Sequence, residues 1–160
     1  MEPTMAYPFN TRSFFTDKET KNIGGGIVLW RGYFQSIRPG IGKMLINVDI
    51  STSAMYQGGP LISLCLAFLG IRDPSLLVKS RIDDRDFYRL RRFLSGLRIQ
   101  LRFAQRNPVV RAVKGLSTNA AERSSIVLKD GSTVPVVKYF EDLTKQRLRF
   151  PGICCVEART

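Results

Sequence analysis

The sequence contains no histidine, and this removes the side chain most often used for proton transfer near neutral pH and for metal binding. Cysteine is also scarce: Cys65 lies in an apolar run, and Cys154 and Cys155 are adjacent near the end. Two neighbouring cysteines make no zinc site without further ligands, and an odd number of cysteines argues against a disulfide framework. We therefore expect a protein that is not an enzyme, holds no metal or cofactor, and keeps its thiols reduced.

Long hydrophobic runs are missing as well. Residues 1–10 are polar with two prolines, so they contain no apolar core of a signal peptide. No stretch approaches the roughly 20 apolar residues that span a bilayer. We expect a soluble intracellular protein with no membrane partner, placed in the cytoplasm with the nucleus as the alternative.

What is abundant is positive charge. The chain has 25 Lys and Arg against 13 Asp and Glu, a net charge of +12. The excess is uneven, because residues 1–80 hold 8 basic and 5 acidic side chains while residues 81–160 hold 17 and 8. Such a surplus favours a polyanionic partner such as nucleic acid. The second half is the part expected to face it.

The stretch from Gly24 to Tyr56 has the clearest local pattern. Met44, Ile46, Val48 and Ile50 alternate with residues of the opposite face, the period of a half-buried strand, and residues 27–37 are rich in aromatic and β-branched side chains. A Pro-Gly turn lies between them. We predict an antiparallel hairpin with one buried face. Gly24–Gly26 lack the Lys-Ser/Thr of a phosphate loop and are interpreted as a flexible entry.

Two helices are predicted next. Residues 61–69 carry apolar side chains at helical spacing between Pro60 and Gly70, and this helix is expected to cover one face of the sheet. A second helix should begin at Asp83, whose carboxylate suits a cap better than catalysis, and end near Gly96. Its outer face holds several arginines, which leaves a solvated surface and an RNA contact equally open: Arg85, Arg89, Arg91 and Arg92.

The remainder predicts short strands with one short helix. Strands are expected at residues 97–103 and 109–116, a polar loop at 118–125, and a hairpin around Asp130-Gly131 that Pro135 interrupts. Residues 136–143 predict a helix with Val136, Phe140 and Leu143 on one side, and residues 146–150 a strand. Basic side chains with aromatics Phe103 and Tyr139 among them fit single-stranded nucleic acid, although either ring also suits a core.

Three segments of the first half form a long, specific combination: Gly24–Gly26, residues 30–39 (WRGYFQSIRP) and residues 47–51 (NVDIS). This combination closely resembles the first linker domain of eukaryotic Argonaute proteins. Downstream, four segments follow one another as in the Argonaute PAZ domain: residues 96–99 (GLRI), 114–117 (KGLS), 137–140 (VKYF) and 148–151 (LRFP). The resemblance implies a small open barrel, related to oligonucleotide-binding and SH3-like folds, with a hairpin–helix insertion at residues 126–144.

In that family the cleft between barrel and insertion holds an RNA 3′ end, and the resemblance carries only part of this pocket over. Tyr139 matches a tyrosine used on the terminal phosphate, and Phe140 matches a packing residue. Phe103 and Arg111 stand where histidine and tyrosine are usual, Ile126 lies near the place of an aromatic, and Thr144 replaces a tyrosine or histidine. Basic side chains should compensate electrostatically for these missing phosphate-binding groups. The expected RNA-binding residues are Tyr139, Phe103, Arg111, Arg102, Arg106, Lys138, Lys145 and Arg147.

The expected fold is therefore α+β: a linker β-hairpin with a helix, then a small open PAZ-type barrel with a hairpin–helix insertion. The expected divisions are an extended lead at residues 1–22, a linker 1-like module at 23–77 and a PAZ-like domain at 78–160 that stops before the family's closing strand. We expect a non-catalytic module of RNA silencing that binds a single-stranded RNA 3′ end or a small-RNA duplex overhang. Its other partners would be the remaining Argonaute domains or silencing-complex proteins. The alternative is a degenerate paralogue with a structural or protein-interaction role and only nonspecific RNA affinity.

Overall fold

The computed structural model describes residues 6–8, 10–101, 108–128 and 130–159, and these form two compact units, Met1–Phe68 and Leu69–Thr160. Both contain antiparallel strands and helical segments, so the predicted α+β class is confirmed. Each unit is described by itself. The predicted division at residues 22 and 77 stays a prediction.

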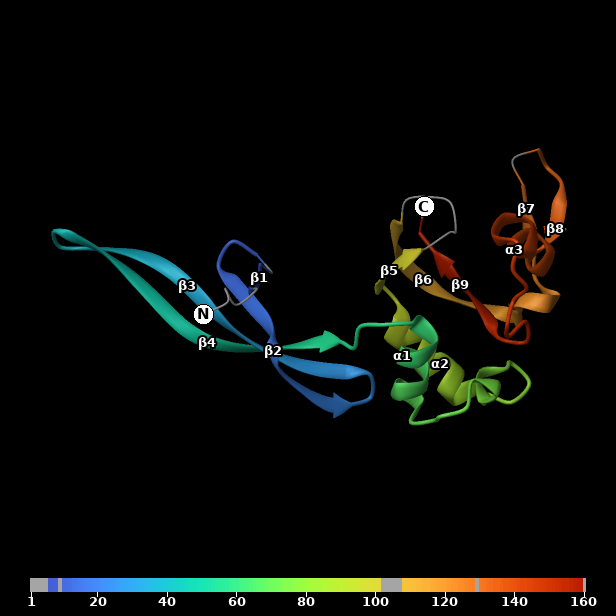
Figure 1. Cartoon of the computed structure of the whole chain (residues 1–160), viewed down its shortest axis with the longest axis horizontal. Coiled ribbons are helices and arrows are strands. Elements are labelled where there is room, and N and C mark those ends of the chain that lie inside the picture. Colours follow the sequence, from blue (N-terminus) through green and yellow to red (C-terminus); the bar gives the residue numbers. More distant parts are fainter. Residues whose placement is uncertain (1–5, 9, 102–107, 129, 160) are drawn as a thin grey trace. The chain divides into compact units, whose positions relative to one another are not determined.

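The first unit is built on one antiparallel sheet in the order β1-β2-β3-β4 (Figure 1). Its strands are β1 (Ala6–Pro8), β2 (Ser13–Gly24), β3 (Ile27–Gly40) and β4 (Lys43–Tyr56). The predicted hairpin is confirmed, and it is longer than the periodicity indicated because β3 and β4 stay paired from Ile27↔Tyr56 to Gly40↔Lys43.

Residues 13–22, expected as an extended lead, are extended because they belong to β2 and pair with β3. Phe14 and Phe15 of β2 pack on β3. Phe15 is buried, and the ring of Phe14 stacks on Tyr33 with centroids 5.4 Å apart. Gly25 and Gly26 form the turn between β2 and β3, with φ of 60° and 74°. Two successive positive φ angles are what a tight hairpin turn needs, so these glycines close a hairpin.

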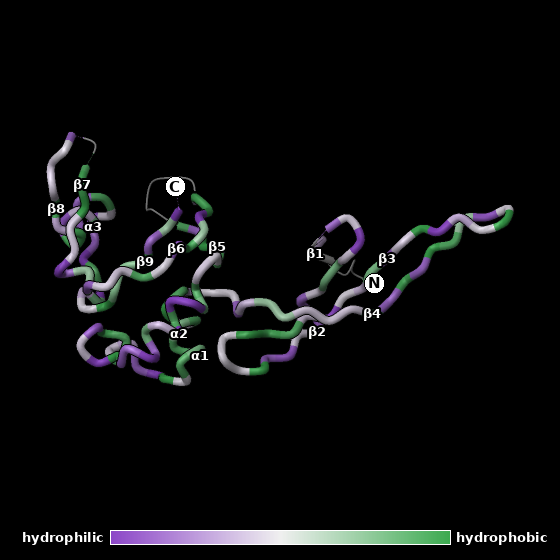
Figure 2. The backbone as a smooth tube through the Cα atoms, turned by 180° about the vertical axis from the view of Figure 1, so that it is seen from behind, coloured by the Kyte–Doolittle hydropathy of each residue, from purple (hydrophilic) through white to green (hydrophobic). Residues whose placement is uncertain are grey.

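The prediction of a buried hairpin face is wrong. Met44, Ile46, Val48 and Ile50 do share a face, but they are 67%, 70%, 62% and 83% exposed. Register places Ile37 opposite Ile46 on the same side, where it is exposed too. Figure 2 shows hydrophobic stretches, coloured green, along the β3–β4 hairpin. The predicted helix α1 (Leu61–Leu69) is confirmed, with Leu64 and Cys65 buried. It does not cover this face, because alternation specifies which residues share a side and not what packs on it.

The second unit begins with a 3-10 turn η1 (Pro74–Leu77) and helix α2 (Asp84–Leu94). The predicted cap is confirmed: the Asp83 carboxylate accepts a hydrogen bond from the Asp86 N–H at 2.6 Å. Helix α2 packs on β6, and Leu94 and Val113 are fully buried at the centre of this unit. The three-stranded sheet runs β5-β6-β9, with β5 (Arg98–Leu101), β6 (Val109–Ala120) and β9 (Cys154–Ala158).

The hairpin–helix segment follows β6 through the turn η2 (Ala121–Arg123). It consists of β7 (Ser125–Val127), β8 (Thr133–Pro135) and α3 (Val136–Thr144), so the predicted hairpin and helix are confirmed. Pro135 does not interrupt the pairing, because it lies opposite Ser125 at the end of the ladder. The proline has no N–H to offer there and serves as the residue before α3.

Two further predictions in this unit are wrong. Residues 118–120 belong to β6 and not to a loop, since Ala120 pairs with Cys154 and is buried. Residues 146–150 form no strand, and the strand that returns to β6 is β9. The reason is local: residues 144–146 are held by the end of α3, so the chain straightens only after Pro151.

Candidate nucleic-acid interface

The hairpin–helix segment places Tyr139 on α3 at one end of the second unit (Figure 1). The Val136 N–H donates to the Ser124 carbonyl at 2.9 Å, and α3 contacts both η2 and β8. These contacts fix the first turn of α3 against the end of β6. The side of α3 that faces away from η2 and β8 is therefore held in a fixed position.

Tyr139 is 38% exposed, so its ring is not sealed in apolar packing. Lys138 and Asp142 share its exposed side of α3, whereas Val136 and Phe140 are half-buried. The packing role expected for Phe140 agrees with this placement. Leu143, predicted on the same side of the helix as these two residues, is 37% exposed. Tyr139 thus offers a partly open aromatic ring beside an ammonium group, which is the chemistry of a base or phosphate contact.

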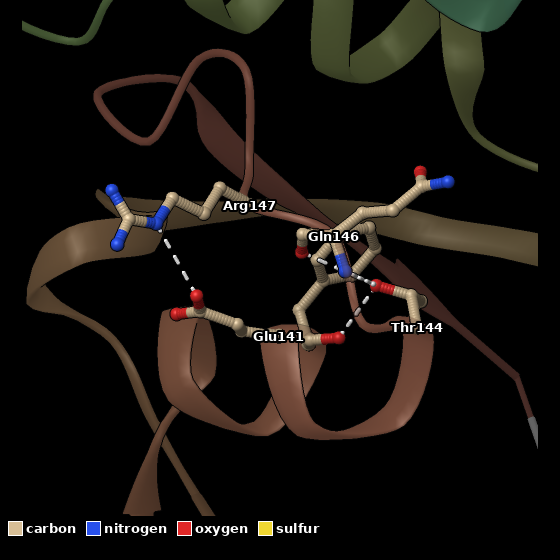
Figure 3. Close-up of polar contacts among 5 residues, drawn as sticks. Glu141, Thr144, Gln146 and Arg147 are labelled. Carbon is tan, nitrogen blue, oxygen red and sulfur yellow. Dashed lines mark hydrogen bonds and ion pairs between the residues drawn. The ribbon is translucent and has the colours of Figure 1, made fainter.

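The end of α3 is closed by its own side chains (Figure 3). Thr144 Oγ1 donates to the Phe140 carbonyl at 2.8 Å and accepts from the Gln146 N–H at 3.2 Å. Lys145 adopts φ 58°, and its N–H donates to the Glu141 carbonyl at 2.8 Å. This left-handed residue ends the helix in the usual way. The hydroxyl of Thr144 is therefore occupied by the helix terminus, a role that the sequence analysis missed.

Arg147 lies next to the same helix end (Figure 3). Its Nε is 3.3 Å from Glu141 Oε1, and its side chain is 91% exposed. An ion pair with so much contact with water contributes little to stability and is easily exchanged. Arg147 can therefore turn toward an arriving phosphate at small cost.

Four of the expected binding residues lie on α3 or directly after it: Tyr139, Lys138, Lys145 and Arg147. Arg111 lies elsewhere, because it is the third residue of β6 and pairs with Ile99 of β5. Nine residues of extended strand, roughly 30 Å, separate it from Ala120, where β6 turns into η2. Arg102, Phe103 and Arg106 lie outside the described residues.

The surface of α3 carries little net charge. Lys138, Lys145 and Arg147 are offset by the neighbouring Glu141 and Asp142, which leaves a local surplus of a single positive charge. The larger concentration of arginine is on α2, where the sequence analysis left its role open. A ligand at α3 would therefore be held by specific contacts more than by charge.

The described residues offer little for covalent chemistry. They contain no group of three or more His, Cys, Asp or Glu side chains that could hold a metal ion. Burial raises the pKa of the Cys65 thiol to about 11, and it also raises the pKa of Cys154 and Cys155. Thiols with raised pKa values are poor nucleophiles. Among these residues there is also no helix long and apolar enough to cross a membrane.

Comparison with known proteins gives these features a context. Residues 11–57 match the Argonaute linker 1 domain. Protein argonaute 12 of Oryza sativa subsp. japonica is 30% identical over 150 residues, which are 92% of this chain and 14% of that protein. The chain therefore spans about a seventh of this relative.

Two solved structures are similar to parts of this chain. The Drosophila Argonaute2 PAZ domain, in a study of its structure and nucleic acid binding, aligns at TM-score 0.50 with 24% identity, covering 64% of this chain and 86% of that one. A second structure of the Drosophila Argonaute 2 PAZ domain, on 3′ end recognition of nucleic acids, aligns at TM-score 0.42 with 23% identity, covering 60% and 80%.

Proposed function

We propose that this chain, which contains an Argonaute linker 1 domain followed by a PAZ-like region and has eukaryotic Argonautes as homologues, binds the 3′ end of a small RNA. Binding at the second unit would hold the end without cleaving it. The observation that carries the proposal is the partial exposure of Tyr139 on α3, in a segment that also contains Lys138, Lys145 and Arg147.

The chemistry supports such a site in two ways. An exposed aromatic ring stacks on a terminal base whatever its identity, and ammonium and guanidinium groups neutralise phosphates. The Drosophila Argonaute 2 PAZ domain recognises nucleic acid 3′ ends, and its fold resembles that of this unit. Because the chain spans a small part of its rice relative, we propose the remaining domains of an Argonaute as its protein partners, in a cytoplasmic silencing complex.

The test is a comparison of two RNA duplexes of equal length in fluorescence anisotropy, one with a two-nucleotide 3′ overhang and one blunt. The intact chain should prefer the overhang, and Tyr139→Ala should weaken overhang binding at least about fivefold, the lower range for loss of one stacked base. Leu143→Ala is the matched control, because Leu143 is as exposed on the same helix and has no phenol ring. Equal affinity for both duplexes, unchanged by Tyr139→Ala, would refute the proposal.

A second candidate is a structural or protein-interaction module with only nonspecific RNA affinity. The exposed apolar face of β3 and β4 favours it, because contiguous apolar surface of this kind usually marks an interaction site. On this alternative, RNA binding would be equal for overhang and blunt duplexes and would vanish at moderate salt. A salt titration with both duplexes separates the two candidates.

A further inference from the structure

Helix α2 carries an aromatic ring in the middle of a basic surface. Tyr88 is 63% exposed, and Arg85 and Arg92 lie three residues before it and four residues after it. Residues at these spacings are neighbours on one side of a helix. The opposite side, with Phe87, Leu90 and Leu94, is buried, and α2 packs on β6. The Arg85–Tyr88–Arg92 face therefore points away from the sheet.

The two arginines of this face are available to a ligand. Among the described residues neither Arg85 nor Arg92 has an ion pair or side-chain hydrogen bond, whereas Arg89 pairs with Asp86 at 2.8 Å. Arg91 lies elsewhere: a Cβ atom built on Gly115 of β6 would be 3.1 Å from its Nε, so its side chain runs along the sheet. The acidic residues of α2 are in its first turn, and Asp84 is 3.6 Å from Lys79 Nζ.

Such a face is unfavourable for folding alone. Like charges three or four residues apart on a helix repel, and Arg85, Arg89 and Arg92 stand at these spacings. The Tyr88 ring touches Phe87 edge-on with centroids 5.7 Å apart, but 63% of the residue stays exposed, so it adds little buried area. An anion with flat, stackable groups relieves the repulsion and uses the ring at the same time.

We propose that the Arg85–Tyr88–Arg92 face of α2 is a second nucleic-acid contact that binds the body of a single strand, with Tyr88 stacking on a base and the two arginines holding phosphates. A single strand is the expected ligand because its bases are free to stack on Tyr88. In a duplex the bases are paired and only the phosphates are accessible to this face. In Figure 1, α2 and α3 lie at separate places in the second unit, so this contact is distinct from the Tyr139 site. It does not depend on a free RNA end.

The test uses the full chain with a circular single-stranded RNA, which has no 3′ end, and a linear RNA of the same sequence. Arg85→Gln with Arg92→Gln should weaken binding of the circle at least tenfold and lower the slope of log affinity against log salt by about 1.4, or 0.7 for each lost phosphate contact. The charge-matched control is Arg72→Gln with Arg159→Gln, two exposed positions outside α2. Tyr88→Leu should lower affinity for the circle at least about fivefold, and Tyr88→Phe should keep it.

The outcomes are separable from those for the 3′-end site. A larger loss of affinity for the circle with Arg85→Gln and Arg92→Gln than with the control pair supports the α2 contact. Equal losses overturn it. Tyr139→Ala should leave the circle unaffected and weaken only the linear RNA. If Tyr139→Ala weakens neither RNA, the 3′-end proposal fails while the α2 contact is still decided by the circle.

The double variant Arg85→Gln with Arg92→Gln should also unfold at the same or higher temperature than the unaltered chain, since it removes like-charge repulsion. A lower unfolding temperature together with lost binding would overturn the proposal in favour of a structural role for these arginines.

Discussion

Gly32 of β3 lies against the backbone of Phe14 in β2: a Cβ atom at position 32 would be 2.0 Å from the Phe14 carbonyl oxygen and 2.6 Å from Phe15 Cδ1. The nearest atom is the backbone oxygen of Phe14, which cannot move aside as the end of a flexible side chain could. Gly32 therefore permits the close approach of β2 and β3 that buries Phe15 and stacks Phe14 on Tyr33.

Gly32→Ala should accordingly destabilise the first unit. Overpacking of this kind lowers the free energy of unfolding by about 3 kcal/mol, at the upper end of the usual range. Gly58→Ala is the control, because nothing lies within 4 Å of a Cβ atom there and its φ is not positive. Urea unfolding followed by Trp30 fluorescence measures both variants. Equal stability of the two would contradict the packing described for Gly32.

Asp83 caps α2 and should contribute measurably to the stability of the second unit. Asp83→Ala leaves the Asp86 N–H without its acceptor and should lower the free energy of unfolding by about 1 kcal/mol. Asp83→Asn keeps an accepting oxygen and should behave nearly as the unaltered chain. The measurement is chemical unfolding monitored by circular dichroism, and an Asn variant as unstable as the Ala variant would show that the charge matters more than the cap.

Lys145 couples stability and binding in opposite directions. Its φ of 58° is unfavourable for a residue with a Cβ atom, so Lys145→Gly should raise the free energy of unfolding by about 0.5 to 1 kcal/mol. The same change removes a positive charge at the end of the helix that carries Tyr139 and should weaken binding of an RNA with a 3′ overhang. Lys145→Ala removes the charge but keeps the strain, and is expected to lose affinity with no gain in stability. Thermal unfolding and anisotropy on the same samples check both effects.

The buried thiol of Cys65 should make stability depend on pH in the alkaline range. Its pKa is raised from 9.0 to about 11 by burial, so between these values the folded state keeps a proton that the unfolded state loses. The stabilisation is complete below pH 9 and falls as pH rises toward 11, by an amount on the order of 2 to 3 kcal/mol. The difference in unfolding free energy between the unaltered chain and Cys65→Ala should be constant below pH 9 and shrink above it. Parallel curves up to pH 11 would contradict this.

The exposed apolar face of β3 and β4 should cause self-association at high concentration. Replacing Ile46 and Ile50 with lysine should reduce it without lowering stability by more than about 0.5 kcal/mol, because both residues are largely exposed. Asn47→Lys with Asp49→Asn changes the charge by the same two units on the opposite face and is the matched control. Dynamic light scattering over a concentration series makes the comparison. Equal behaviour of the two variants would mean that charge alone, and not the apolar face, controls association.

The sequence predicted the local structure well where a residue type has one strong conformational consequence. Asp83 and Gly96 bracketed α2, and the apolar spacing after Pro60 predicted α1. The hairpin was recognisable from alternation, but its turn is Ile41-Gly42, because Pro39 and Gly40 still pair with β4. The burial of its face was not, because the same alternation occurs whether or not a layer covers one side.

The candidate site was predicted less completely. Tyr139 was identified through the resemblance, and it lies with Lys138 on an exposed side of α3. The use of Thr144 to close α3 depends on hydrogen bonds that a sequence does not display. Tyr88 was missed because periodicity places it outside the apolar stripe, where a lone aromatic carries no signal until its exposure among the arginines is seen.

Strand β6 pairs with two strands of the second unit, β5 and β9. Its first residues pair with β5 and its later ones with β9, with irregularities in register only along the second half. A single inserted or deleted residue near Val113 would turn one set of side chains to the wrong side and misalign two ladders at once. Length changes among relatives should therefore accumulate outside this strand, and an engineer wishing to attach a reporter to the unit should avoid β6 altogether.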